Sequence, residues 1–463
     1  MGIGLLYPHK HFIKGRNMLR FISFFILLSA GSIAKAADYA YVVLGEDGVQ
    51  VSRVITSDAK CPLIQFDGKR VRMDVRALPA SLPGRADKPS VFPLLTCEKT
   101  IPSNTRHAML GHVFLPLLSH EVKRIVVIGD TGCRLKKGDH AYQACNDENL
   151  YPFARIAASA AGWKPDLVIH VGDLLYREDP CPPGHPECNG SPWGYGWDAW
   201  QADFFEPGAS LVKAAPWALV RGNHESCSRA GQGWWRMIDP RPLQSGRDCN
   251  DAIDDDIGDY SDPYAIPLGD DAQLIVMDTS NTIEKAIPPG DIRWFKYREL
   301  YHKLESLLQQ ASNNIVADHH PILGLFASED GRLLPGNQGI QSVFGELNPQ
   351  ILPSGVSVLL SGHVHAWQQV SFSSAHPTQF IAGFSGTMED SAEMPDKLPS
   401  NATPAPGAVI EHLSSWAGGF GYMTMERTGA ARWEARVWDA NGTLRNTCMI
   451  DGSRSVCDQA RIE

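Results

Sequence analysis

The stretch DLVIHVGDLLY, residues 166 to 176, places an apolar strand directly before a glycine, a carboxylate and a tyrosine. Its apolar run is continuous rather than alternating, which is typical of a strand that is covered on both faces. Asp173 stands where this strand ends, and Tyr176 follows three residues later. An aromatic residue in this place usually fills a core. The role of Tyr176 therefore depends on the rest of the chain.

Five further apolar runs end in a polar or glycine turn in the same way: RIVVIGD (124–130), PWALVRGNHE (216–225), LIVMDTS (274–280), NIVADHH (314–320) and VSVLLSGHVH (356–365). Helical patterns lie between them at 153–163 after Pro152 and at 292–310 after Asp291. In the second helix, the residues predicted to share one face are Leu300, Leu304, Leu307 and Leu308. Strands that alternate with helices predict an α/β domain.

The segments on either side of this pattern have a different character. Short alternating stretches between 39 and 78, broken by glycine, proline and aspartate, predict a small β-rich N-terminal domain over 37–120. The predicted α/β domain spans 121–463 and ends in alternating strands joined by a hairpin at Asn441-Gly442. Segments 329–339 and 391–419 are predicted to be long loops.

The first 36 residues have the features of an export signal. Four basic residues, Lys10, Lys14, Arg16 and Arg20, precede an apolar run over 21–34 and the tripeptide AKA at 34–36. A membrane anchor is the alternative, but a spanning helix needs about 18 or more apolar residues. We expect a signal peptide over 1–36, cleavage after Ala36, a secreted or periplasmic protein, and no membrane span in the mature chain.

Charge and cysteine content narrow the class of protein. The formal charge of −10 becomes −15 when the five basic residues of 1–36 are removed. Such an acidic chain is not expected to bind nucleic acid, and its oligomeric state stays open. The ten cysteines contain no Cys-x-x-Cys pair. In an exported protein they suggest up to five disulfides, and the simplest connectivity joins Cys61–Cys97, Cys133–Cys145, Cys181–Cys188, Cys227–Cys249 and Cys448–Cys457.

Candidate metal ligands gather where the strands end. They are Asp130, Asp173, Asn223, His319, His363 and His365. Each has an ordinary alternative, because aspartate caps helices, asparagine occupies turns and a single histidine is often a core residue. Together they should meet at the carboxyl edge of one sheet. Carboxylate and imidazole without thiolate suit Fe, Mn or Zn, and six ligands hold two ions if one carboxylate bridges. Two such ions favour phosphoester hydrolysis.

Five motifs now carry a family resemblance: GDTG (129–132), GDLLY (172–176), GNHE (222–225), VADH (316–319) and GHVH (362–365). In order and spacing they resemble the calcineurin-like metallophosphoesterases, and among these the purple acid phosphatase branch. The resemblance implies an α/β sandwich. Most of the superfamily has a histidine ligand where this chain has Gly132, whereas the purple acid phosphatase branch has glycine there and a tyrosine ligand from Gly-Asp-x-x-Tyr. Tyr176 matches that tyrosine.

The resemblance also implies a role for each motif residue. The first metal, Fe(III), would be held by Asp130, Asp173, Tyr176 and His365. The second, which is Fe, Zn or Mn, would be held by Asp173, Asn223, His319 and His363. Asp173 would bridge the two ions, and a metal-bound hydroxide would be the nucleophile. His224 would contact the substrate phosphate beside Asn223 and protonate the leaving oxygen, with Glu225 as its hydrogen-bond partner.

Some neighbouring residues are expected to have structural roles. His320 should face away from its ligand neighbour on strand geometry, His170 should be structural, and Asp278 should cap a turn. Arg134, with Lys136 and Lys137, could contact substrate anions, but a solvated loop is the favoured interpretation. A further set of aromatic residues could line the cleft or pack the loop that carries them: Trp193, Tyr195, Trp197 and Trp200.

Three functions fit these observations. The first is an exported dinuclear phosphomonoesterase that acts on a small phosphoester. The second is a phosphodiesterase or nucleotide hydrolase with the same metal site, because the motifs build the metal site and not the leaving-group pocket. The third is a catalytically silent binding protein that keeps the fold.

Overall fold

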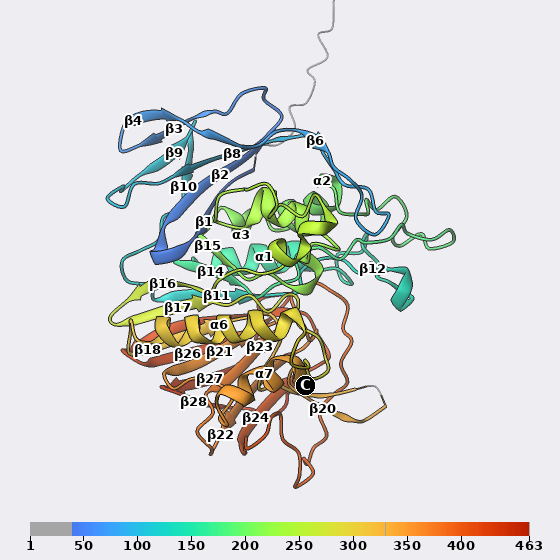
Figure 1. Cartoon of the computed structure of the whole chain (residues 1–463), viewed down its shortest axis with the longest axis vertical. Helices are drawn as coiled ribbons and strands as arrows, with labels where there is room; N and C mark the ends of the chain where they lie inside the picture. Colours follow the sequence, from blue (N-terminus) through green and yellow to red (C-terminus); the bar gives the residue numbers. More distant parts are fainter. Residues whose placement is uncertain (1–38, 329, 463) are drawn as a thin grey trace, which may run out of the picture. The chain divides into compact units, whose positions relative to one another are not determined.

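Two β-sheets packed face to face form the framework, with helices on their outer faces (Figure 1). The computed structural model describes residues 39–328 and 330–462. The predicted signal peptide lies outside the described residues. Among the helices that are described, none is long and apolar enough to cross a membrane.

The larger sheet has eleven strands in the order β28-β27-β26-β25-β11-β14-β15-β1-β2-β8-β5. Its centre is parallel, because β11 pairs with β14 and β14 with β15 in the same direction. The strands are β1 (Tyr39–Leu44), β2 (Gln50–Thr56), β5 (Asp74–Ala77), β8 (Leu95–Thr100), β11 (Arg124–Ile128), β14 (Leu167–His170), β15 (Trp217–Leu219), β25 (Gly421–Gly429), β26 (Arg432–Asp439), β27 (Leu444–Asp451) and β28 (Arg454–Cys457).

The smaller sheet has seven strands in the order β16-β17-β18-β21-β23-β22-β24. Strands β17, β18, β21 and β23 run parallel to one another. The strands are β16 (Tyr264–Gly269), β17 (Ala272–Val276), β18 (Asn313–Ala317), β21 (Val356–Ser361), β22 (Trp367–Phe372), β23 (Thr378–Ala382) and β24 (Ile410–Trp416). Three short hairpins lie outside both sheets: β6 (Ala80–Ser81) with β7 (Val91–Phe92), β12 (Leu135–Lys136) with β13 (Ala141–Tyr142), and β19 (Leu325–Ala327) with β20 (Leu333–Pro335).

The N-terminal region is rich in strands, as predicted. It contains a separate four-stranded sheet made of β3 (Leu63–Phe66), β4 (Lys69–Arg72), β9 (Ala108–Leu110) and β10 (Val113–Leu115). Strand β1 pairs in parallel with β15 through Val43 and Trp217, so β1, β2, β5 and β8 extend the larger sheet. The larger sheet therefore contains strands from both sides of the predicted domain boundary at residue 120. The division of the chain into two domains stays a prediction.

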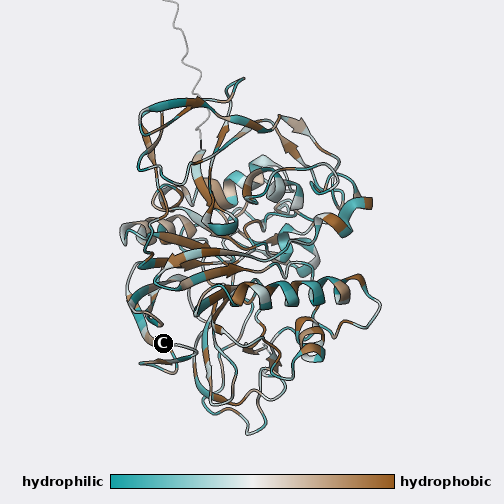
Figure 2. Ribbon diagram, turned by 60° about the vertical axis from the view of Figure 1, so that its left-hand side comes forward, coloured by the Kyte–Doolittle hydropathy of each residue, from teal (hydrophilic) through white to brown (hydrophobic). Residues whose placement is uncertain are grey.

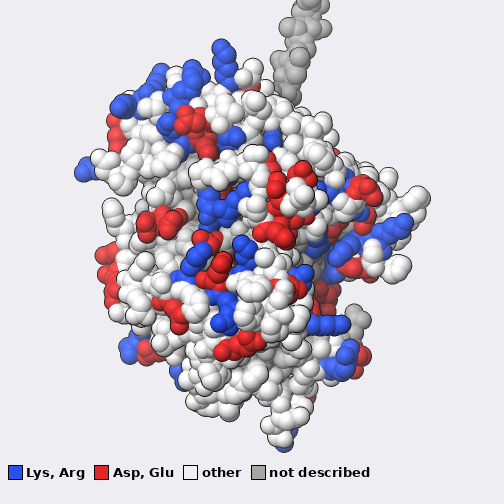
Figure 3. Space-filling model, viewed as in Figure 1, with Lys and Arg blue, Asp and Glu red and all other residues white. Residues whose placement is uncertain are grey.

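Burial on both faces explains the continuous apolar runs. Ile125 and Val127 of β11 point into the core between the sheets, whereas Val126 and Ile128 pack under the helices on the other side. This is the two-residue period of a strand. Brown, hydrophobic stretches accordingly run through the strands in the middle of the molecule (Figure 2). On the surface, basic and acidic side chains are mixed over the face in view (Figure 3).

The two predicted helices are confirmed. Helix α1 (Phe153–Gly162) packs on the larger sheet, and α6 (Ile292–Leu308) covers the smaller one, beginning after the capping side chain of Asp291. The remaining α-helices of the described residues are α2 (Trp197–Trp200), α3 (Ala209–Val212), α4 (Gly231–Gly233), α5 (Asp255–Gly258) and α7 (Gln338–Leu347). The long-loop predictions are wrong in part, because 329–339 contains β20 and the start of α7, and 391–419 contains β24.

Five disulfides join the ten cysteines. The pairs are Cys61–Cys97, Cys133–Cys145, Cys181–Cys188, Cys227–Cys249 and Cys448–Cys457. The connectivity between sequence neighbours is therefore confirmed. The two cysteines of each pair are at most 36 residues apart. The bridges therefore join segments that are near each other in the sequence, and they do not link the two sheets to each other.

Candidate metal centre

The six polar residues predicted at strand ends lie at one edge of the sandwich. Parallel strands β11, β14 and β15 end just before Asp130, Asp173 and Asn223, and β18 and β21 of the other sheet end just before His319 and His363. Three of these residues have a left-handed backbone: φ is 54° at Asp130, 57° at Asp173 and 70° at His363. Such strain in non-glycine residues is concentrated at functional sites.

Tyr176 lies at the centre of one half of this cluster. Its hydroxyl oxygen is 2.7 Å from Asp130 Oδ1, 2.9 Å from Asp173 Oδ2 and 2.8 Å from His365 Nε2. A phenol has one proton to donate, so it cannot satisfy two carboxylates together. Three oxygen atoms and one nitrogen atom converge here from four residues. Such a set of ligand atoms is suited to bind a cation.

Asp173 connects this half to a second one. Its Oδ2 atom, which faces Tyr176, also lies 3.1 Å from His319 Nε2. Asn223 Oδ1 is 3.0 Å from that same His319 nitrogen and 3.1 Å from His363 Nδ1. The second half therefore joins one carboxylate oxygen, one amide oxygen and two imidazole nitrogens. Asp173 Oδ2 belongs to both halves, as a bridging ligand would.

The orientation of the Asn223 amide bears on this assignment. The reversed amide would place its nitrogen toward Asp173, His319 and His363 and its oxygen 2.8 Å from Arg229 Nη1. That arrangement suits a centre without metal. A bound cation requires the oxygen to face inward, because an amide nitrogen donates protons and offers no free lone pair to a metal.

Each histidine is oriented by a contact at its other ring nitrogen. His319 Nδ1 lies 2.8 Å from the carbonyl oxygen of Val171, and His365 Nδ1 lies 2.8 Å from that of Met388. Both rings therefore present Nε2 to the cluster. His363 is turned the other way, with Nε2 3.3 Å from Glu284 Oε1 and Nδ1 facing inward. Such outer contacts set the tautomer and direction of metal-binding histidines.

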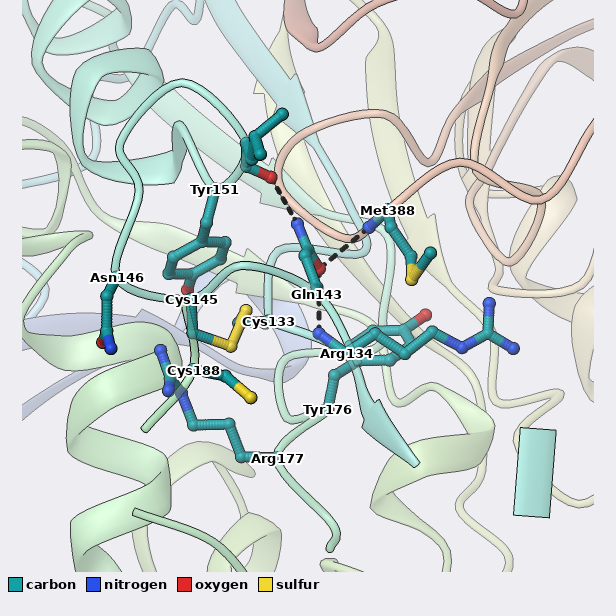
Figure 4. The surroundings of a disulfide bond; sticks show 12 residues. Cys133, Arg134, Gln143, Cys145, Asn146, Tyr151, Tyr176, Arg177, Cys188 and Met388 are labelled. Atoms are coloured by element: carbon teal, nitrogen blue, oxygen red, sulfur yellow. Dashed lines mark hydrogen bonds between the residues drawn. A yellow bond between two sulfur atoms is a disulfide. The ribbon is translucent and has the colours of Figure 1, made fainter. Parts of the chain in front are cut away.

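Met388, whose carbonyl oxygen orients His365, donates its backbone amide to a buried glutamine, Gln143 (Figure 4). Gln143 Oε1 accepts hydrogen bonds from the amides of Arg134, at 2.9 Å, and Met388, at 3.0 Å. Its Nε2 donates to the carbonyls of Leu150 and Gly386 at 2.7 and 2.8 Å. This amide satisfies four backbone groups and ties the 386–388 turn to the loop closed by the Cys133–Cys145 disulfide.

Electrostatics also favour a cation at the cluster. Asp130 and Asp173 are 0% and 1% exposed, and adjacent buried carboxylates need a positive partner. Burial, followed by the charges of Asp130 and Asp173, holds the pKa of Tyr176 well above its usual value. A phenolate at this position therefore requires a metal ion, whose charge reverses this effect. The residues present fit a pair of metal ions.

Gly132 leaves room for the second motif and none for a ligand of its own. A Cβ atom at this position would lie 2.7 Å from the backbone nitrogen of Tyr176 and 2.9 Å from the carbonyl oxygen of Leu174. It would also lie 2.8 Å from Asp203 Oδ2, which accepts a hydrogen bond from the Tyr176 amide. The Tyr176 loop packs directly on Gly132, so a histidine at 132 cannot coexist with the tyrosine in this geometry.

His224 lies against Tyr176, with the two ring centroids 3.8 Å apart. Its Nδ1 is 2.9 Å from the carbonyl oxygen of Leu175 and 3.2 Å from Glu178 Oε1, and its Nε2 is 3.8 Å from Asp173 Oδ2. Glu178 also accepts from Tyr195 at 2.8 Å and forms an ion pair with Arg229. Glu178 and Arg229 were not predicted from the sequence. Each is a charged residue a few positions after a motif, Glu178 after GDLLY and Arg229 after GNHE. That position is the signal that could have identified them.

The sequence model of the calcineurin-like phosphoesterases matches residues 123–367, more than half of the chain. The chain belongs to the calcineurin-like phosphoesterase family. The phosphoesterase is similar in fold to the purple acid phosphatase from seeds of yellow lupin (Lupinus luteus), with a TM-score of 0.56, 13% identity and coverage of 91% of this chain and 74% of that one. A structure of PhoD gives a TM-score of 0.52 at 12% identity and covers 91% of each chain. No curated protein sequence matches.

Membership of the family implies a dinuclear metal centre, and the predicted α/β sandwich and hydrolase class are confirmed. One predicted contact of the phosphoesterase is wrong. The carboxylate of Glu225 does not face His224, whose partner is Glu178. It turns back within a short 3₁₀ turn and accepts from the amides of Asp173, Leu174, Leu175 and Gly222 at 2.8–3.2 Å. It thereby shapes the loop that carries Asp173.

The expectation that His320 faces away is also wrong. Strand β18 ends at Ala317, so strand alternation no longer applies to His320. Its ring lies 4.3 Å from that of His363, and His319, His320 and His363 form a group that could hold an ion. His170 is structural as expected: it accepts from the Gly172 amide and contacts Thr131 Oγ1 at 3.0 Å.

Other neighbours of the centre have structural contacts. Asp278 accepts from the Ser280 amide, as a turn residue does, and also forms a buried ion pair with Arg221 at 2.7 Å. Arg134 pairs with Asp139 and Asp390, and Lys136 with Asp139. The aromatic segment packs its loop, because three of its four rings are buried: Tyr195, Trp197 and Trp200.

A cavity of about 630 Å³ opens beside the metal centre of the phosphoesterase. Its wall includes His363 and Asp390, which contact the centre, and the apolar side chains of Pro321, Phe326 and Leu334. This volume is in the range of pockets that bind small organic molecules. A group bound in it would lie next to the second half of the centre.

Proposed function

We propose that this phosphoesterase is an exported dinuclear phosphomonoesterase of purple acid phosphatase type. Fe(III) would bind in the first half of the centre, to Asp130, Asp173, Tyr176 and His365. Fe, Zn or Mn would bind in the second half, to Asp173, Asn223, His319 and His363. The observation that supports this most strongly is the position of the Tyr176 hydroxyl, which faces two carboxylates and an imidazole within 2.9 Å. An anionic phenolate among hard oxygen ligands favours a trivalent ion.

The two ions, when bound, supply charge that stabilises the phosphoryl group and a water molecule of lowered pKa. The chain itself orients the substrate. The phosphate would rest beside Asn223 and His224, where the cation of Arg229 is also close. Because His224 Nδ1 is engaged by Leu175 and Glu178, Nε2 is the atom that would hand a proton to the leaving oxygen. Glu178 would stabilise the ring while it carries both protons.

The organic part of the ester would occupy the 630 Å³ cavity. Phe326, Leu334 and Pro321 provide apolar surface there, and Asn337 provides a polar group. Phosphodiesters are the second candidate substrates, because this cavity is large enough to hold an organic substituent. A panel of phosphomonoesters, phosphodiesters and nucleotides separates these candidates. Diester cleavage that is far faster than monoester cleavage contradicts the proposal, and no hydrolysis by metal-replete protein points to a silent binding protein.

The iron assignment is tested by metal analysis and visible absorption spectroscopy. We expect two metal equivalents with at least one iron, and a phenolate-to-iron charge-transfer band that Tyr176→Phe removes. Tyr264→Phe is the matched control, since Tyr264 is buried and its hydroxyl contacts the Leu44 carbonyl outside the centre. Protein with two metals that include iron but without the band in its oxidised form contradicts the role of Tyr176. A colourless protein with two zinc ions removes iron from the proposal.

Export is supported by the five disulfides, which persist in oxidising compartments. Sequencing the N-terminus of protein expressed from the full chain tests it. We expect the mature chain to begin at Ala37 outside the cytoplasm, and an uncleaved cytoplasmic chain contradicts the proposal.

A further inference from the structure

A second cavity, of about 250 Å³, lies beneath helix α6 and is separate from the one beside the metal centre. None of its lining residues belongs to the wall of the larger cavity. Helix α6 contributes Lys296 and Tyr297, the segment before β16 contributes Tyr260 and Ser261, and Arg247 comes from the loop closed by the Cys227–Cys249 disulfide. This is a small polar chamber, with a volume for a compact ligand.

Tyr297 is the residue of this chamber that most strongly indicates a bound ligand. Its side chain is fully buried, and its hydroxyl has no hydrogen-bond partner among the residues that the structure describes. Burial, followed by the nearby charge of Asp278, holds the pKa of Tyr297 well above its usual value. The hydroxyl therefore stays protonated as a donor. A buried polar group without a partner costs free energy that a bound acceptor would recover.

Two cations line the chamber without an acidic partner. Within the described part of the chain, Arg247 and Lys296 form no ion pair, and Arg247 Nε also lacks a hydrogen-bond partner. Arg247 Nη2 contacts the Tyr260 carbonyl at 3.1 Å, and Lys296 Nζ stands 5.7 Å from the centre of the Tyr260 ring. Arg247 Nη2 also donates to Ser261 Oγ at 3.3 Å, so both cations have contacts in the chamber but no carboxylate partner among the described residues.

The acidic residues of the lining are largely neutralised by other groups. Asp278 pairs with Arg221 at 2.7 Å, and Asp262 pairs with Lys303 at 2.6 Å. Glu299 is exposed at the rim and opposes an anion there.

The chamber thus offers two cations without an ion pair and an unpartnered hydroxyl donor, beside Arg241, which pairs with Asp239. Two carboxylates of the lining, those of Glu299 and Asp262, are exposed, and Asp262 has Lys303 as its partner. Among the lining groups without an ion pair, two positive charges therefore face one negative charge.

We propose that this chamber binds a small oxyanion, such as phosphate or a small carboxylate, at a site separate from the metal centre. The anion would accept from the Tyr297 hydroxyl and from Arg247 and Lys296. Oxyanions are recognised by charge-assisted hydrogen bonds of this kind. The site lies close to the catalytic turns, since Asp278 on its wall pairs with Arg221, two residues before Asn223.

Equilibrium dialysis of the metal-loaded protein with radiolabelled inorganic phosphate tests this site. We expect two phosphates per chain in the wild type, one at the metal centre and one in the chamber. The double variant Lys296→Met with Arg247→Met should lose one of them, and Tyr297→Phe should weaken the same one about tenfold or more. Arg298→Met is the matched control, because Arg298 lies on the same helix, is absent from the chamber wall and pairs with Glu346 outside it, and it should keep both.

The outcomes separate this inference from the proposed function. If the metal centre binds no phosphate, the wild type binds one and the double variant none, which still supports the chamber. Equal binding by a folded double variant and the wild type overturns it, as does unchanged binding by Tyr297→Phe, which removes a single oxygen. Competition with malonate identifies the class of anion: displacement of the chamber phosphate assigns carboxylates to the site, and no displacement assigns tetrahedral oxyanions.

Discussion

Gly132→Ala tests the reason why a tyrosine, and not a histidine, completes the first half of the centre. The added Cβ would lie 2.7 Å from the Tyr176 backbone nitrogen, 2.8 Å from Asp203 Oδ2 and 2.9 Å from the Leu174 carbonyl. Two of these three atoms belong to the backbone and cannot rotate away. Overpacking of this kind costs about 1–3 kcal/mol. The backbone of Tyr176 must also move, which shifts its hydroxyl from Asp130 and Asp173.

Urea unfolding and the visible spectrum measure the two effects of Gly132→Ala. We expect a free energy of unfolding that is lower by about 1–3 kcal/mol and a weaker or shifted charge-transfer band. Gly138→Ala is the control in the same loop, because a Cβ at Gly138 would meet no described atom within 4 Å. If Gly132→Ala matches the wild type in both stability and spectrum, Gly132 is not the constraint that excludes a side chain, and the reasoning is refuted.

Three further predictions concern stability. Replacing Cys227 and Cys249 with serine should lower the free energy of unfolding by about 3 kcal/mol, as expected for a loop of 22 residues, and unchanged denaturation midpoints would contradict this. Burial lowers the pKa of His170 to about 3, so the unfolded chain binds a proton that the folded chain does not, and stability falls as pH drops from about 6.5 toward 3. His170→Gln should reduce that slope by up to about 1.4 kcal/mol per pH unit, and an equal slope would exclude His170 as its source. Asp278→Asn leaves the buried cation of Arg221 unpaired and should cost about 3–5 kcal/mol, whereas a loss below about 1 kcal/mol in thermal or urea unfolding would show that solvent reaches Arg221.

Local patterns were enough to predict an α/β domain and six candidate ligands, whereas the sandwich and the role of Tyr176 were implied by the family resemblance. Each candidate ligand directly follows an apolar strand, so its place at the carboxyl edge depends on nothing but strand order and direction. The disulfide connectivity was predictable for a similar reason, because sequence neighbours close short loops. These inferences needed no knowledge of long-range packing.

Contacts between distant segments could not be predicted in this way. Gln143 reaches Met388 across 245 residues, and nothing in its own surroundings marks it. Glu178 replaces Glu225 beside His224 because a short 3₁₀ turn directs Glu225 back to the backbone. The error at His320 came from extending strand alternation beyond the end of β18. Each miss therefore occurs where a strand has ended and irregular backbone begins.

That irregular backbone also suggests how the centre is held ready for metal. Left-handed φ angles at Asp130, Asp173 and His363 each cost about 1–3 kcal/mol, and hydrogen bonds at the same residues offset this cost. Asp130 Oδ2 accepts from the His363 amide at 2.9 Å, and Glu225 accepts from the Asp173 amide at 3.1 Å. Because these bonds do not involve metal, the ligand backbone should keep its conformation when metal is removed. The free-energy cost of removing the metal then comes from the buried carboxylates, whose charge is no longer neutralised. The backbone fold of the loops does not contribute to this cost.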